Sequence, residues 1–241
     1  MSGGLNVYPD GMPHPSPRVR RNVALELLVL LTLTSLYVTF MPADRAMAID
    51  MGMALVGIGL VGILARESCK RLWGPPSSPD FERFRRSSGL MVISTAPVLA
   101  VLAAFGIFLA YNSTEPHAWS NVFHRFFRWH IPLAFLLYVF WAMMQQTLFQ
   151  FYLLGRLRAL LPFASPLTLS IINGVLYGCV HLPDPALTIL TMIGGVVWSF
   201  SYHRDRFVVP IALSHAIAGT AYFYWVKDSD IIDKLLKSFA N

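Results

Sequence analysis

Long stretches of apolar residues, most of them close to 20 residues long, follow one another along this chain, and short segments containing proline or arginine separate them. About 20 consecutive apolar residues in a helix cross the hydrocarbon core of a bilayer, which is roughly 30 Å thick. The pattern therefore predicts an all-α polytopic membrane protein, a bundle of about seven transmembrane helices. The predicted spans are residues 23–41, 46–65, 90–111, 131–154, 167–181, 186–202 and 207–226.

The fifth and sixth spans are short for a bilayer. Residues 167–181 and 186–202 are separated by Pro183 and Pro185, and proline interrupts a helix because it lacks a backbone donor. Two arrangements stay open at this point: two complete crossings, or a tight hairpin within the membrane.

Outside the predicted helical domain, 23–226, two terminal segments differ in character. Residues 1–22 are rich in proline and glycine, which predicts a disordered cytoplasmic tail. Residues 227–241 space apolar side chains at helical intervals against lysines, which indicates either an amphipathic segment on the membrane surface or an ordinary helix end.

Composition supports lipid as the solvent. The 241 residues are 55% hydrophobic and 13% charged, too few polar side chains for the surface of a soluble globule of this size. The net charge of +6 does not indicate nucleic acid as a partner, because the basic residues flank apolar stretches, where they set membrane orientation. We expect a multi-pass integral membrane protein with a cytoplasmic N-terminus. The basic residues assigned to the cytoplasmic side are Arg18, Arg20, Arg21, Arg66, Lys70, Arg71, Arg83, Arg85, Arg86, Arg156, Arg158, Arg204 and Arg206.

Polar residues occur in three of the predicted spans, where an unpartnered polar group costs several kcal/mol. Each span carries a pair four residues apart, one helical turn on a single face. Successive pairs lie 34 or 35 residues apart, close to one helix plus a loop, so we expect the three faces to converge. The pairs are Gln146 and Gln150, Tyr177 and His181, and His215 and Gly219.

These motifs resemble the CPBP family of intramembrane proteases, which includes the type II CAAX prenyl endopeptidases and bacteriocin self-immunity proteins. The family carries Glu-Glu-x-x-x-Arg, Phe-x-x-x-His and His-x-x-x-Asn on successive membrane helices. Gln145-Gln146-x-x-x-Gln150 is similar to the first motif, and the other two pairs are similar to the second and third. The resemblance covers residues 140–221, with Leu-Pro after His181 and Pro-Ile before His215 as further points of likeness.

In the family, the second glutamate activates water, the two histidines assist, and the asparagine helps to hold the oxyanion. The resemblance places these roles on Gln146, His181, His215 and Gly219. A glutamine amide cannot act as a general base near neutral pH, and glycine has no side chain to donate a hydrogen bond. With Gln150 in place of arginine, no charge is left unpaired, and a Gln146–Gln150 hydrogen bond can replace an ion pair.

We therefore predict a decayed glutamate site in a protein that binds a membrane-anchored protein or peptide. One alternative is an active CAAX-type intramembrane endopeptidase with histidine-based chemistry, and another is a small transporter, since polar residues in a span also mark substrate paths. We expect no cofactor and no metal, because two histidines are too few ligands. Asp184 could complete a set with the histidines or simply cap the loop after Pro183.

Overall fold

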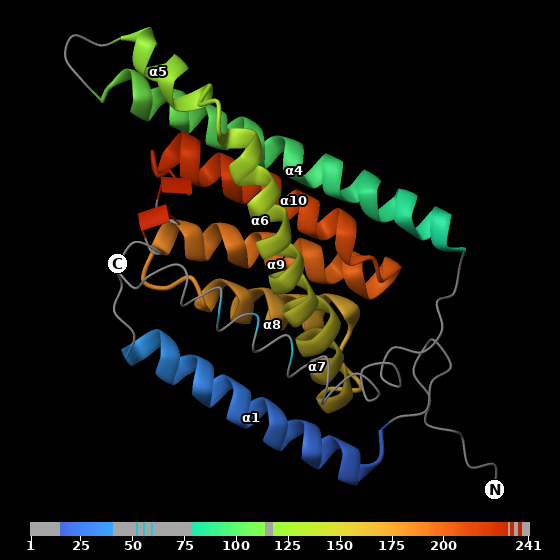
Figure 1. The fold of residues 1–241 in the computed structure, drawn as a ribbon. Coiled ribbons are helices and arrows are strands. Elements are labelled where there is room, and N and C mark those ends of the chain that lie inside the picture. Colours follow the sequence, from blue (N-terminus) through green and yellow to red (C-terminus); the bar gives the residue numbers. More distant parts are fainter. Residues whose placement is uncertain are drawn as a thin grey trace, which may run out of the picture.

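The fold is known from a computed structural model, which describes residues 15–40, 79–113 and 118–230, together with positions 52, 55, 59, 232, 233, 236 and 237. Every regular element in these residues is helical, as the sequence predicts (Figure 1). The helices are α1 (Pro17–Phe40), α4 (Asp80–Tyr111), α5 (Trp119–Phe126), α6 (Ile131–Gln146), η1 (Thr147–Leu153), α7 (Leu154–Leu160), α8 (Pro166–Cys179), α9 (Pro185–Asp205), α10 (Val208–Ala221) and η2 (Tyr222–Val226).

Three helical stretches of the described chain are long and apolar enough to cross a membrane. They are Asp80–Tyr111, the continuous α6, η1 and α7 from Ile131 to Leu160, and Pro185–Asp205, and the apolar α8 is shorter. The total of about seven spans stays a prediction, since most of the predicted span 46–65 lies outside the described residues. Helix α1 begins at Pro17, six residues before the predicted start at residue 23, because proline suits the first helical position.

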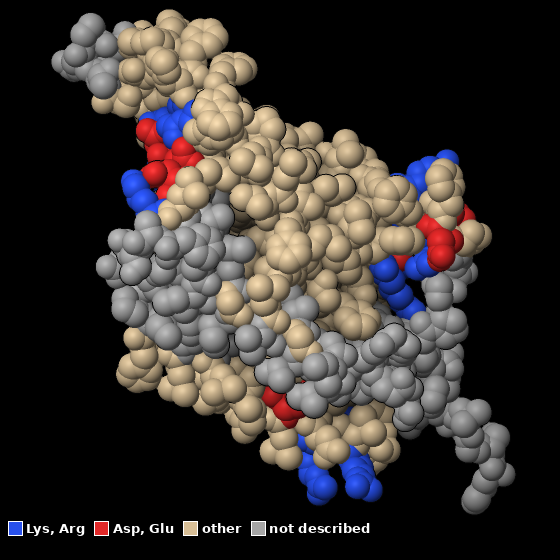
Figure 2. All heavy atoms as spheres, in the orientation of Figure 1, with Lys and Arg blue, Asp and Glu red and all other residues tan. Residues whose placement is uncertain are grey.

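Charged side chains gather at opposite ends of the bundle, with an uncharged band between them on the face that Figure 2 shows. At one end, Arg20 donates to the Leu160 carbonyl at 3.3 Å, and Arg86 lies 3.2 Å from the Asp205 carboxylate. At the other end, Arg125 and Arg128 pair with Asp228. The separation is what lipid requires, because charged groups are costly in the hydrocarbon core. Which end faces the cytoplasm stays a prediction.

Helices α8 and α9 pack directly against each other as an antiparallel pair joined at the proline-containing loop, and whether both cross the membrane stays a prediction. Ser165 caps α8 by accepting from the Thr168 N–H at 3.1 Å, and Asp184 caps α9 by accepting from the Leu187 N–H at 3.2 Å. Small residues allow a close approach: a Cβ on Gly195 would lie 2.9 Å from the Gly174 Cα. Helix α9 has 21 residues, enough to cross the membrane core.

Candidate functional site

A π-helix divides the first polar motif. Helix α6 ends at Gln146 and η1 runs from Thr147 to Leu153, so the i→i+5 pattern replaces the α-helical turn between Gln146 and Gln150. The two side chains meet different helices, Gln146 contacting α10 and Gln150 contacting α8. The expected Gln146–Gln150 hydrogen bond does not form: Gln146 bonds through its Nε2 and Gln150 through its Oε1, and neither Gln146 Oε1 nor Gln150 Nε2 has a hydrogen-bond partner in the described part of the chain. The hydrogen bond expected between these two glutamines was therefore wrong.

Gln146 reaches His215 of α10. Its amide Nε2 lies 3.3 Å from His215 Nδ1, and Gln146, Tyr177 and His215 are all buried. An amide nitrogen can only donate, so in this arrangement His215 Nδ1 accepts and the ring proton belongs on Nε2. The Tyr177 hydroxyl lies 3.1 Å from the same Nδ1 and donates to Gln145 Oε1 at 3.3 Å. The four side chains form a neutral network.

Gln150 belongs to a second network, on α8 and α9. Asn173 Nδ2 donates to Gln150 Oε1 at 3.2 Å, to Ser199 Oγ at 2.8 Å and to the Phe149 carbonyl at 3.3 Å. Gln150 and Asn173 are both completely buried. Asn173 was not among the site residues predicted from the sequence, although an asparagine inside an apolar helix was a usable signal.

His181 lies beside the first network rather than in it. Helix α8 ends at Cys179, and His181 Nδ1 lies 3.0 Å from the carbonyl oxygen of Tyr177. Within the described chain, no hydrogen bond joins His181 to His215 or to a glutamine.

Asp184 is engaged elsewhere. Besides capping α9, its carboxylate lies 2.8 Å from Lys227 Nζ. Partial burial acts to raise the Asp184 pKa, but hydrogen bonds from Lys227 and the Leu187 N–H outweigh it and hold the pKa below its ordinary value. Of the two roles that the sequence left open, the structure places Asp184 in the cap.

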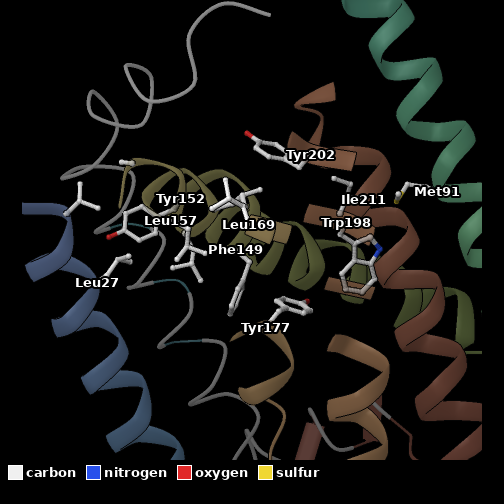
Figure 3. Packing of buried hydrophobic residues seen from close by; sticks show 14 residues of the cluster. Leu27, Met91, Phe149, Tyr152, Leu157, Leu169, Tyr177, Trp198, Tyr202 and Ile211 are labelled. Atoms are coloured by element: carbon white, nitrogen blue, oxygen red, sulfur yellow. The ribbon is translucent and has the colours of Figure 1, made fainter. Parts of the chain in front are cut away.

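Aromatic rings enclose the first network. The ring centroids of Phe149 and Tyr177 are 4.5 Å apart and those of Tyr177 and Trp198 are 5.6 Å apart, both edge-to-face. The Trp198 ring lies over His215 at 4.8 Å. Figure 3 shows Phe149, Tyr177 and Trp198 together within the hydrophobic core. Such packing fixes the orientation of the polar side chains.

A cavity of about 320 Å³ lies on the side of His215 that faces α4 and α9. Its walls come mainly from α4, α9 and α10, and they are almost entirely apolar, with His215, Ser214 and Thr95 among the few polar members. Thr95 and Ser214 bond each other at 2.6 Å, and the Trp198 indole donates to Ser214 at 3.1 Å. His215 therefore stands between a polar network and an apolar cavity.

Gly219 also lines this cavity, and the ring of Tyr138 occupies the space beside it. A Cβ on Gly219 would lie 2.4 Å from Tyr138 Cε1 and 2.7 Å from the Tyr138 hydroxyl oxygen. No side chain larger than hydrogen fits at position 219 while Tyr138 keeps its place. Tyr138 thus fills the room that the third motif gives to asparagine.

The arrangement holds neutral amides, a phenol and imidazoles, but no carboxylate in hydrogen-bond contact with His215 among the described residues. In that same part of the chain, no three His, Cys, Asp or Glu side chains come together as a metal ion would need. The first network can hydrogen-bond a ligand, but it lacks the carboxylate base of the family pattern.

Comparison with known proteins gives one family. Residues 126–221 match the family model described as "Type II CAAX prenyl endopeptidase Rce1-like". The match confirms the resemblance stated from the motifs, and it spans every motif position from Gln145 to Gly219. No curated protein and no solved structure matches the chain.

Proposed function

We propose that this homologue of the CAAX-type intramembrane endopeptidases has lost peptidase chemistry and acts by binding a membrane-anchored protein or peptide. The contact between Gln146 and His215 carries the proposal. At the position where the family pattern has the water-activating glutamate, a buried amide donates to the histidine, and an amide cannot take a proton from water near neutral pH.

The surroundings of this pair support the same conclusion. The Tyr177 hydroxyl lies within 3.4 Å of both ring nitrogens of His215, so the imidazole is already engaged on the side of the glutamines. A catalytic water beside Gln146 would need room and hydrogen-bond partners. The rings of Phe149, Tyr177 and Trp198 pack edge-to-face around the network and restrict the room for such a water. The cavity on the other side of His215 offers an apolar ligand a place without requiring hydrolysis.

One observation favours the alternative of an active enzyme with histidine chemistry: the His215 ring also lines the cavity. In that mechanism, His215 would remove a proton from water at the cavity wall, and the glutamine amides would donate to the oxyanion. Donors of this kind, held in a site without water, contribute roughly 3 to 4 kcal/mol. The two readings differ in one measurable result, cleavage.

The experiment is cleavage of a broad library of membrane-anchored peptides by the purified chain in liposomes, read by mass spectrometry. A His181→Ala, His215→Ala double variant is assayed beside it, and an active CAAX endopeptidase shows that the library contains cleavable peptides. We expect no cleavage by either form of this chain and retention of library peptides on liposomes that carry the wild type. Cleavage that the double variant loses would overturn the proposal in favour of histidine chemistry.

A further inference from the structure

Tyr138 is a buried residue whose hydroxyl makes no hydrogen bond to any residue that the structure describes. The side chain is 7% exposed, and it lines the cavity together with His215 and Gly219. The Tyr138 and His215 rings meet edge-to-face, with their centroids 5.6 Å apart. A tyrosine buried in apolar surroundings ordinarily finds a partner, because its desolvated hydroxyl otherwise costs roughly 1 to 3 kcal/mol.

We propose that Tyr138 takes the place of the missing side chain at position 219, and that its hydroxyl donates a hydrogen bond to a backbone carbonyl of a polypeptide bound in the cavity. The inference rests on the proposed function. It adds that the Tyr138 hydroxyl is the hydrogen-bond donor and that a free backbone carbonyl of the bound polypeptide is the acceptor. The geometry supports this, because the Tyr138 hydroxyl oxygen would lie 2.7 Å from a Cβ on residue 219. The hydroxyl thus occupies the space that a side chain at position 219 would fill.

The depth of Tyr138 favours a polypeptide over a lipid. Tyr138 is the eighth residue of α6, about 10 Å along the helix from its start at a rise of 1.5 Å per residue. The ester carbonyls of bilayer lipids belong to the interfacial region outside the hydrocarbon core, and acyl chains carry no acceptor. A polypeptide carries one carbonyl per residue and can present an acceptor at any depth.

The carbonyl must be free, which restricts the ligand further. In an uninterrupted transmembrane helix every internal carbonyl already accepts from the N–H four residues later. A proline lacks that N–H and leaves the carbonyl four residues before it available. The cavity should therefore prefer a membrane-spanning segment whose helix is broken at the level of Tyr138, with apolar side chains to fill the walls formed by α4 and α9.

The test uses the full chain in proteoliposomes and two synthetic peptides of about 21 residues, long enough to span the bilayer. One peptide is a leucine-alanine helix, and the other is identical except that a Gly-Pro pair replaces its two central residues; both carry a dye for a fluorescence binding assay. We expect tighter binding of the interrupted peptide. Tyr138→Phe, which removes only the hydroxyl, should weaken that binding roughly tenfold and leave the uninterrupted peptide unchanged. Unchanged binding of the interrupted peptide by Tyr138→Phe would overturn the inference.

A second pair of variants asks whether the hydroxyl stands in for residue 219. Tyr138→Ala empties the space, and the double variant Tyr138→Ala, Gly219→Asn returns an amide donor to it. We expect the double variant to bind the interrupted peptide more tightly than Tyr138→Ala alone. Gly89→Ala is the matched control for a glycine substitution, since nothing lies within 4 Å of a Cβ there. No gain in the double variant would argue against substitution of one side chain for the other.

A photoreactive residue at Ile193, which is exposed and lines the cavity, identifies the occupant. We expect cross-links to the interrupted peptide. If the residue instead cross-links to a diazirine-labelled phospholipid, and the peptide does not displace that lipid, the cavity is a lipid site and the inference is overturned. The same samples separate this inference from the proposed function. Cleavage of the peptide would refute the loss of peptidase chemistry, whereas equal binding of both peptides would refute carbonyl recognition and leave polypeptide binding intact.

Discussion

The amide nitrogen of Gln146 lies 3.3 Å from Nδ1 of His215, and the Gln146 carbonyl oxygen has no hydrogen-bond partner in the described part of the chain. This contact joins α6 to α10 at membrane depth. It is neutral on both sides, so the bundle avoids the desolvation of a charge at this point.

Gln146→Glu should destabilise the protein. An ionised carboxylate cannot donate to Nδ1, and an uncompensated buried charge costs about 3 to 5 kcal/mol; to avoid that cost the glutamate must bind a proton or pair with a protonated His215, and each of these also costs free energy. Thermal unfolding in detergent should show a clear loss. Gln145→Glu is the matched control and should cost much less, because Gln145 is partly exposed and offers Tyr177 only an oxygen acceptor, which glutamate retains. Equal melting temperatures for Gln146→Glu and the wild type would contradict this account.

Rebuilding the family motifs requires a fifth change. Gln145→Glu, Gln146→Glu, Gln150→Arg and Gly219→Asn restore the pattern, but asparagine at position 219 collides with the Tyr138 ring. We expect the fourfold variant to fold poorly and to show no cleavage of the peptide library. Adding Tyr138→Ala opens the space for the asparagine amide, and any revived cleavage of the peptide library should appear only in the fivefold variant. Equal cleavage by both variants would show that Tyr138 does not block position 219.

The sequence predicted the helical membrane character, the break between α8 and α9 and the meeting of Gln146, Tyr177 and His215, because apolar length, proline positions and helical spacing carry that information. It did not predict the separation of Gln146 from Gln150, since a π-helix looks like any other apolar segment in a periodicity analysis. Tyr138 was also missed. An aromatic residue in an apolar helix is unremarkable until the packing partner, Gly219, is known from three dimensions.

Asn173→Ala should cost about 2 to 3 kcal/mol in the free energy of unfolding, because it removes donors to Gln150, Ser199 and the Phe149 carbonyl and leaves buried acceptors without partners. Chemical or thermal unfolding in micelles gives the difference. Asn112→Ala is the matched control: the Asn112 side chain is exposed at the end of α4 and donates only to the Phe108 carbonyl, so its loss should cost less than about 0.5 kcal/mol. A similar cost for the two variants would show that the buried network does not stabilise the fold.

Asp184 should make the stability depend on pH at the acidic end. The folded-state pKa of Asp184 lies below the ordinary value of 3.8, so its stabilising effect is complete above that value and is lost as the pH falls through the folded pKa. The melting temperature of the wild type should exceed that of Asp184→Asn at neutral pH, and the gap should close below about pH 4.

Asp184→Ala separates the helix cap from the charge. Asparagine retains the cap on α9, whereas alanine removes it at a further cost of about 1 kcal/mol at every pH. A gap between the wild type and Asp184→Asn that stays constant from pH 7 to pH 3 would exclude the ionised carboxylate as its source.

The fit of Tyr138 against Gly219 also bears on the evolutionary history that is open to this protein. Asparagine cannot enter at position 219 while the tyrosine ring is in place, and a smaller residue at position 138 leaves a void until asparagine arrives. Each single substitution, at position 138 or at position 219, is therefore disfavoured, whereas the two substitutions together avoid both the collision and the void. Substitution of glutamates at positions 145 and 146 alone therefore does not give this chain the family pattern at position 219, which also requires a change of Tyr138.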